Sequence, residues 1–319
     1  MWPQALPFWR SASSSYAGDV DLLFVGLLMA SLLVLALLFA LILIFVIRYR
    51  KGSTAERGDR IKKSWHWEVS WTTATLAAFL GLFVWGAGLY LRVFDAPADG
   101  LPIYVVAKQW MWKVQHPGGQ REINELHIPA GRTVRLTMAS QDVIHNFFVP
   151  AFRVKHDVVP GRYQSLWFKA EKPGVFSLLC AEYCGTDHSA MTGRVVVMKP
   201  ADYSAWLGRQ DVDGTMAAQG AALFRSLGCS GCHGTGGAVR APPLEGVYGR
   251  PVPLADGSIV VADERYIRDS ILQPRSQIVA SYEPLMPSFA GRISEDDLVK
   301  MIAYIKSLGP QDPSLSQQQ

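Results

Sequence analysis

Several features are scarce or absent in this sequence of 319 residues. Residues 1–20 hold no continuous apolar segment, so a cleavable signal peptide is not expected. The net charge is only +4, and beyond the first 92 residues bases and acids nearly balance, thirteen against twelve in 93–213 and nine against nine in 215–309. These counts give no support for a basic surface, so no nucleic-acid partner is expected. Internal repeats are absent, and only four cysteines occur.

Two long apolar runs stand out against this background. Residues 22–47 and 69–91 carry no charge, and each exceeds the roughly 20 residues that cross a bilayer. The segment between them, 48–63, holds seven bases against two acids, which favours the cytoplasmic side. Residues 1–92 are therefore predicted to be an N-terminal segment and a transmembrane hairpin, with everything from about residue 93 outside the cytoplasm.

The outer part divides at two polar, turn-prone stretches, 94–102 and 208–214. Between them, short β-branched and aromatic segments alternate with Pro and Gly turns, a pattern typical of an all-β sandwich or barrel. We predict an all-β domain over 93–210 and an all-α domain over 211–309. The tail, 310–319, has too little apolar content to fold.

The clearest helix of the C-terminal domain follows Ser294. This serine can cap the helix, with Asp297 three residues later, and Gly309 ends it. Between these signals the apolar residues recur at helical spacing.

The second cysteine pair lies in the motif CSGCH, residues 229–233. In an exported domain this motif predicts covalent haem c, with thioether bonds from Cys229 and Cys232 and with His233 as an iron ligand. A thioredoxin-like redox pair is the alternative, but its βαβ setting is missing. Met286, in the loop PLMPSF, is the candidate for the sixth iron ligand, and Met301 is the competitor on the apolar stripe of the last helix.

The first pair, Cys180 and Cys184, admits two interpretations. In an oxidising compartment a disulfide is the simple one. However, His188 and Met191 follow closely, and His145 is available upstream, so soft sulfur and imidazole can converge as they do at copper sites. Two thiolates exceed what a mononuclear blue-copper centre uses, which favours two copper ions bridged by the cysteines.

This arrangement, H145 followed by CAEYCGTDHSAM at 180–191 and preceded by a two-helix hairpin, closely resembles subunit II of the haem-copper cytochrome c oxidases. The added haem domain resembles the branch with a fused C-terminal cytochrome c, and the likeness spans about residues 20–309. The resemblance implies a cupredoxin-like fold for 93–210 and a dinuclear CuA centre. Its implied copper ligands are bridging Cys180 and Cys184, terminal His145 and His188, the weak axial Met191, and the backbone carbonyl of Glu182.

More local matches suggest further roles. The Glu182 side chain matches a ligand to a magnesium or manganese ion shared with subunit I. Trp110, in QWMWKV, matches the aromatic residue that mediates electron entry, although an ordinary strand residue is an alternative. Asp157, in KHDVVPGR, matches a residue that hydrogen-bonds beside the copper ligands. Glu68, in WEVSWT, matches the carboxylate at the entrance of a proton path, with an interfacial acid as the alternative; Thr75 stands where the family usually has Pro.

The resemblance implies an electron-entry subunit of a respiratory terminal oxidase in a bacterial plasma membrane, with the outer domains on the periplasmic side. A cytochrome or another periplasmic donor would reduce haem c, CuA would collect the electrons, and subunit I, accompanied by subunit III, would reduce oxygen to water. Alternatives are a CuA-containing nitric-oxide reductase subunit and a membrane-tethered electron-transfer module without oxidase activity. A quinol-oxidase subunit is disfavoured because that branch lacks the copper ligands. The remaining histidines match no ligand position and are interpreted as ordinary polar residues: His66, His116, His127 and His156.

Overall fold

The computed structural model describes residues 12–56, 65–97, 99–209, 214–234 and 241–309. The chain forms two compact units, Met1–Ala96 and Pro97–Gln319. The predicted tail, most of the second predicted linker and half of the basic segment between the apolar runs lie outside the described residues.

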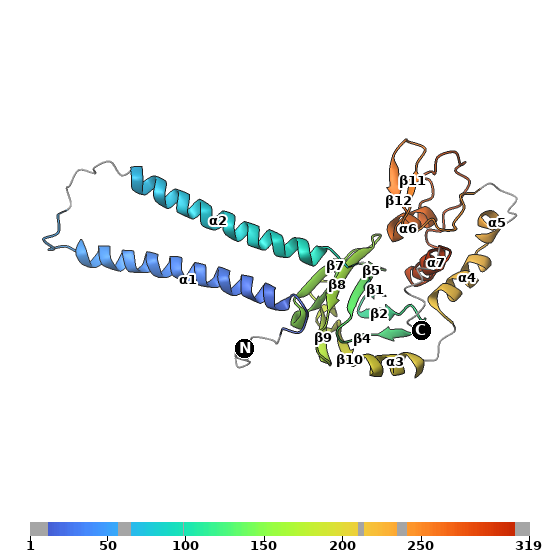
Figure 1. Cartoon of the computed structure of the whole chain (residues 1–319), viewed down its shortest axis with the longest axis horizontal. Helices are drawn as coiled ribbons and strands as arrows, with labels where there is room; N and C mark the ends of the chain where they lie inside the picture. The colour runs from blue at the N-terminus through green and yellow to red at the C-terminus, as the bar shows by residue number, and fades with distance from the viewer. Residues whose placement is uncertain (1–11, 57–64, 98, 210–213, 235–240, 310–319) are drawn as a thin grey trace. The chain divides into compact units, whose positions relative to one another are not determined.

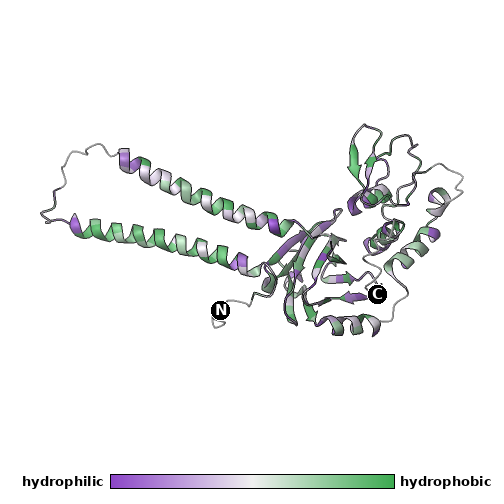
Figure 2. Cartoon of the chain, viewed as in Figure 1, coloured by the Kyte–Doolittle hydropathy of each residue, from purple (hydrophilic) through white to green (hydrophobic). Residues whose placement is uncertain are grey.

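The first unit is a pair of long helices, α1 (Ala17–Arg48) and α2 (Trp65–Phe94). Both are long and apolar enough to cross a membrane, and their apolar side chains are almost entirely exposed. Figure 2 shows apolar colour along most of both helices, with polar residues near their ends. An ion pair of 3.3 Å joins Arg92 near the end of α2 to Asp19 in the first turn of α1. The two predicted spans lie within these helices.

The first part of the second unit is a sandwich of two five-stranded sheets (Figure 1). One sheet has the order β3-β2-β1-β5-β8, with β1 (Leu101–Lys108), β2 (Met111–Gln115), β3 (Arg121–Ile123), β5 (Thr133–Ser140) and β8 (Gln164–Lys169). The other has the order β4-β10-β9-β6-β7, with β4 (Glu125–Pro129), β6 (His145–Val149), β7 (Val154–Val158), β9 (Gly174–Cys180) and β10 (Thr192–Met198).

Alternating apolar residues of both sheets fill the space between them. Trp112, Phe147 and Phe168 are fully buried there, and the Trp112 and Phe147 rings meet edge to face at 5.4 Å. This alternation, seen clearly in β4 and β5, is typical of strands in a sandwich, whereas β1 buries five consecutive residues because both of its faces are covered. The cupredoxin-like all-β fold is confirmed. A helix, α3 (Pro200–Arg209), follows the last strand.

The C-terminal part is helical, as predicted, and carries one small hairpin. Its elements are α4 (Met216–Ser226), α5 (Ser230–His233), β11 (Pro251–Pro253), β12 (Ile259–Val261), α6 (Glu264–Leu272) and α7 (Glu295–Ser307). The predicted cap of the last helix is present, since the Ser294 hydroxyl accepts a hydrogen bond from the Asp297 backbone N–H at 3.2 Å.

The closest approach in this part is between α4 and α7. A Cβ added at Gly220 would lie 2.1 Å from the Lys300 carbonyl oxygen, so only glycine allows the two helices to cross this closely. The crossing encloses an apolar core that includes Phe224, Leu298 and Ile302.

Candidate metal centre and haem site

Strand pairing brings the copper-type ligands together from two segments far apart in the chain. His145 begins β6 and Cys180 ends β9, and these strands are neighbours in which Phe147 pairs with Cys180. The loop after Cys180 then turns back through a short 3₁₀ helix (His188–Ala190) to Met191, immediately before β10. One strand end and one loop therefore supply every predicted ligand.

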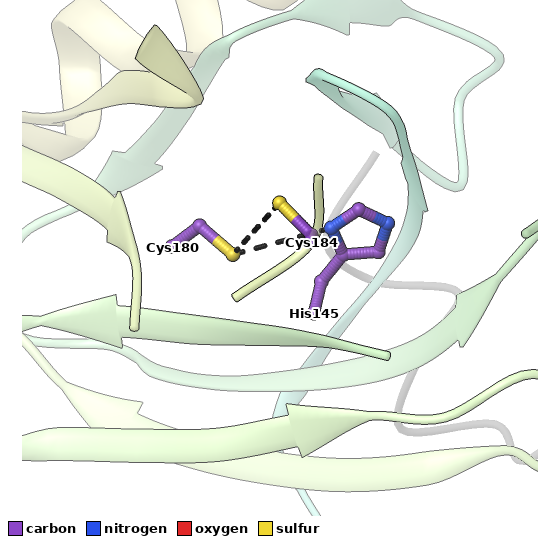
Figure 3. A group of neighbouring side chains, drawn as sticks. All are labelled: His145, Cys180 and Cys184. Atoms are coloured by element: carbon purple, nitrogen blue, oxygen red, sulfur yellow. Dashed lines mark hydrogen bonds between the residues drawn. The ribbon is translucent and has the colours of Figure 1, made fainter. Parts of the chain in front are cut away.

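The ligand atoms lie close enough to share a metal centre. The Cys180 and Cys184 sulfurs are 3.8 Å apart, and His145 Nδ1 lies 4.0 Å from the Cys180 sulfur (Figure 3). His188 Nδ1 is 3.4 Å and the Met191 sulfur 3.7 Å from the Cys184 sulfur. The predicted carbonyl ligand is also in place.

That carbonyl belongs to Glu182, and its oxygen lies 3.2 Å from the Cys180 sulfur. The Glu182 side chain itself is exposed, as is Tyr183 beside it. In contrast, His145, Cys184 and Met191 are buried. The centre thus has a closed inner side and an outer rim.

The two thiols differ in acidity. Burial opposes ionisation of Cys180, but hydrogen bonds with the His145 ring and with backbone groups outweigh it and lower the pKa to about 6. Burial, reinforced by the negative charge of Cys180, raises the pKa of Cys184 to about 12. A metal ion must therefore displace a proton from Cys184 on binding.

The His145 ring is oriented by Asp142, which the sequence analysis did not single out. Its Nε2 donates to an Asp142 carboxylate oxygen at 2.8 Å, which leaves Nδ1 facing the sulfurs. The same carboxylate accepts from the Gln109 and Val143 backbone N–H groups. Although burial favours the protonated acid, these bonds hold the pKa of Asp142 below its usual range. A carboxylate that fixes the tautomer of a ligating histidine is a common feature of metal sites.

Asp157 and Trp110 both lie beside the ligands. Asp157 accepts a hydrogen bond of 2.6 Å from Asn146, the neighbour of His145, rather than from His145 itself. The Trp110 ring N–H and the Gln109 side-chain amide both donate to the Cys184 carbonyl, at 3.3 and 2.7 Å.

The donor set fits copper. Thiolate and thioether sulfur suit Cu(I), and imidazole suits both copper oxidation states. In the described part of the chain this is one of two clusters of metal-ligating side chains, and it is the one that contains sulfur.

The other cluster consists of Glu122, Glu125 and His127, and His116 also bonds to Glu122. His116 is fully buried, and its Nε2 lies 2.8 Å from a Glu122 carboxylate oxygen. Its Nδ1 lies 3.2 Å from the Tyr203 hydroxyl of α3. His127 bonds to the second Glu122 oxygen. Despite burial, these bonds lower the pKa of Glu122 to about 2. His127 also stacks on Trp206 of α3 at 4.7 Å. His116 and His127 are thus not ordinary polar residues: they join α3 to the sandwich.

The CSGCH segment forms the short helix α5. His233 Nδ1 donates to the Pro242 carbonyl at 3.0 Å, which fixes the tautomer and leaves Nε2 free of that bond. The ring is therefore prepared to offer Nε2 to an iron.

A cavity of about 270 Å³ opens beside this helix. Cys229, Cys232 and His233 line it, together with apolar side chains of α6 and α7. Both candidate sixth ligands also line it: Met286 is partly buried, and Met301 is 1% exposed within the core of the domain. An apolar cavity that carries two thiols and one imidazole fits a covalently attached haem.

Glu68 lies in the first turn of α2 and is exposed in the described unit. It belongs to neither cluster.

Two family models match the outer part of the chain. The model for the periplasmic domain of cytochrome c oxidase subunit II matches residues 119–199, and the model for cytochrome c matches residues 217–309. The chain is 30% identical over 302 residues to cytochrome c oxidase subunit 2 of Alkalihalophilus pseudofirmus, covering 87% of this chain and 85% of that protein. It is 31% identical over 207 residues to alternative cytochrome c oxidase subunit 2 of Bradyrhizobium diazoefficiens, covering 54% of this chain and 73% of that protein.

Proposed function

Because this chain belongs to the cytochrome c oxidase subunit 2 family, we propose that it is the electron-entry subunit of a respiratory haem-copper terminal oxidase. Electrons from a cytochrome donor pass through haem c to dinuclear CuA and on to subunit I, where oxygen is reduced to water. The observation that carries this proposal is the convergence of two thiols, two imidazoles and one thioether in a chain that also holds the haem-attachment motif.

The copper ligands have distinct tasks in this proposal. Cys180 and Cys184 would both hold the two copper ions through their thiolates, while His145 and His188 would supply the nitrogen ligands. The remaining ligands are the Met191 thioether and the Glu182 carbonyl. A dinuclear copper centre and a covalent haem, when bound, each supply a reversible one-electron carrier.

The protein's own contribution is to fix the positions of these ligand atoms. The bond from His145 to Asp142 and the two bonds to the Cys184 carbonyl fix the ligands before any metal arrives, which is how a site avoids reorganisation. The exposed Glu182 carboxylate is free to ligate a magnesium or manganese ion together with subunit I.

A haem would be attached through Cys229 and Cys232, and His233 and Met286 would be its iron ligands. The loop position and partial burial of Met286 leave its thioether less committed to packing than that of Met301.

In this proposal the hairpin spans a bacterial plasma membrane beside subunits I and III, and both outer domains lie in the periplasm. The basic residues between the two helices support this orientation.

Two residues outside the ligand sets also take part. Trp110, bonded to the Cys184 carbonyl, mediates electron transfer at the copper, and Glu68 marks the entrance of the proton path. We expect Trp110→Phe and Glu68→Gln each to slow oxygen uptake while copper and haem contents stay unchanged. Turnover equal to that of the unmodified complex would show that Trp110 has only a structural role, or that Glu68 is only an interfacial acid.

The purified complex separates the candidate functions. Oxygen uptake driven by a reduced cytochrome supports the oxidase, consumption of nitric oxide without oxygen uptake supports the reductase, and neither activity supports a membrane-tethered carrier. The last two outcomes overturn the proposal.

A further inference from the structure

The haem-attachment domain and the sandwich share a small apolar cluster. Tyr104 and Val106 of β1 pack against Met216 of α4 and Val299 of α7, and all four side chains are at most 5% exposed. We call these four residues the interdomain seat. On β1 the other residues, such as Val105, face the sandwich core, so the seat uses the outer face of the sheet.

A polar group borders the seat. Lys113 of β2 forms an ion pair of 2.8 Å with Asp296 in the first turn of α7. The Gln115 and Gln141 side-chain amides reach the same carboxylate, each at 3.5 Å. Three donors from the sandwich therefore converge on one acceptor of the helical domain, which fixes orientation as well as contact.

A second contact lies on α6. Arg268 is 5% exposed and pairs with Glu295 at 2.5 Å, yet it also donates to the Gly161 carbonyl of the sandwich at 3.1 Å. Its guanidinium lies 5.8 Å from the centre of the Tyr163 ring. Tyr163 in turn packs against the core of the helical domain.

The loop that carries Gly161 and Tyr163 follows β7, whose last residue, Val158, pairs with His145. The contact through Arg268 therefore reaches the loop after β7, the strand that pairs with β6 and its ligand His145. Ile267, beside Arg268, lines the cavity next to the CSGCH helix.

We propose that the interdomain seat and its polar border hold the haem domain in one fixed position on the β3-β2-β1 side of the sandwich, so that the two electron carriers form one rigid unit. The inference rests on the proposed function, because the fixed position matters only if electrons pass from the haem to the copper. A flexible tether alone supplies an effective concentration on the order of millimolar and many orientations. A buried seat with converging hydrogen bonds selects one orientation.

The test uses the full complex and a carbodiimide, which joins contacting lysines and carboxylates without a spacer. We expect a Lys113–Asp296 cross-link in the unmodified protein, read by peptide mass spectrometry. In Val299→Glu its yield should fall roughly tenfold or more, since an unpaired carboxylate is not tolerated in an apolar contact.

Two controls keep the result decisive. Lys306 and Glu264 lie 2.9 Å apart, on α7 and α6 of the helical domain, so their cross-link should persist in Val299→Glu and report that this domain is still folded. Ser307→Glu places the same charge at an exposed position of α7 and should leave both cross-links intact. If Val299→Glu also loses the Lys306–Glu264 cross-link, Val299→Ala replaces it, with a smaller fall in the Lys113–Asp296 yield expected.

Rapid mixing separates this inference from the function it rests on. Slower copper reduction through the haem in Val299→Glu, together with loss of the Lys113–Asp296 cross-link, supports both. An undiminished Lys113–Asp296 cross-link in a folded Val299→Glu protein, or no such cross-link in the unmodified protein, overturns the fixed seat. A normal cross-link pattern, together with copper reduction that does not depend on the haem, overturns electron transfer from haem to copper. It does not contradict the fixed position of the haem domain.

Discussion

The copper-type centre and the haem cavity are built in opposite ways. At the former, the ligand atoms are linked to one another by contacts of 3.2–4.0 Å, and carboxylate, amide and indole groups hold the surrounding backbone and ring. At the latter, the wall is mainly apolar, and the Pro242 carbonyl orients the His233 ring.

The contrast follows from what each site receives. Metal ions bring no surface of their own to bury, so the protein must arrange charges and lone pairs in advance. A haem brings a large apolar face and becomes part of the core around it. The sandwich should therefore fold before copper binds, whereas the helical domain needs haem to fill its cavity.

The sharpest way to break this contrast is to remove each pair of cysteines. Cys180→Ser combined with Cys184→Ser should remove all copper, because the remaining imidazole and thioether ligands lack the thiolates that hold it. Haem content should be unchanged. Copper analysis and the haem spectrum of one preparation test both statements.

The reciprocal control is Cys229→Ala combined with Cys232→Ala, which should keep copper and lose covalent haem. Copper lost from both double variants would show that the sites are not independent. Copper retained at full stoichiometry in the Cys180 and Cys184 variant would contradict the ligand assignment.

A smaller change tests the haem side alone. Met286→Ala should abolish the low-spin spectrum of the reduced haem while the covalent attachment remains, because the proposed sixth ligand is lost. Met301→Leu is the matched control: the side chain is buried in the core, so a replacement of similar volume should leave the spectrum unchanged. The opposite pattern would move the ligand to Met301.

Strong, local patterns were readable from the sequence. The apolar runs, the alternating strands and the Ser294 cap each depend on neighbours a few residues away, and the structure contains all three. The copper-type side chains were found because four of them lie within one short stretch, with His145 available as a second imidazole upstream.

What escaped the sequence analysis depends on tertiary geometry. Glu122 is only six residues from His116 and five from His127, but the folded chain is needed to bring the three side chains together, and α3 supplies Tyr203 from far along the chain. Lys113 and Asp296 are 183 residues apart. Asp142 was closer at hand, three residues before His145, but its role depends on the turn in which the Ser140 hydroxyl donates to the Val143 carbonyl.

Asp142 gives the next test, within the copper-type centre. Asp142→Asn removes the carboxylate that orients the His145 ring, so copper affinity should fall roughly 10–100-fold, as for other partners of ligating histidines. Asp157→Asn is the matched control, since Asp157 bonds to Asn146 and not to His145. We expect it to change copper affinity much less. Competition with a copper chelator measures both, and an equal loss in the two variants would deny Asp142 a special role.

The smallest effect is expected at Met191. Its sulfur lies 3.7 Å from the Cys184 sulfur, and its side chain is 1% exposed, so leucine can occupy the same space with little loss of packing. Met191→Leu should therefore retain copper but change the reduction potential and the optical spectrum, because a weak axial ligand tunes a copper centre more than it holds the metal. Met138→Leu, a fully buried methionine of β5, controls for packing and should alter neither property. Loss of copper from Met191→Leu would make the thioether a principal ligand, and an unchanged potential with copper retained would remove it from the ligand set.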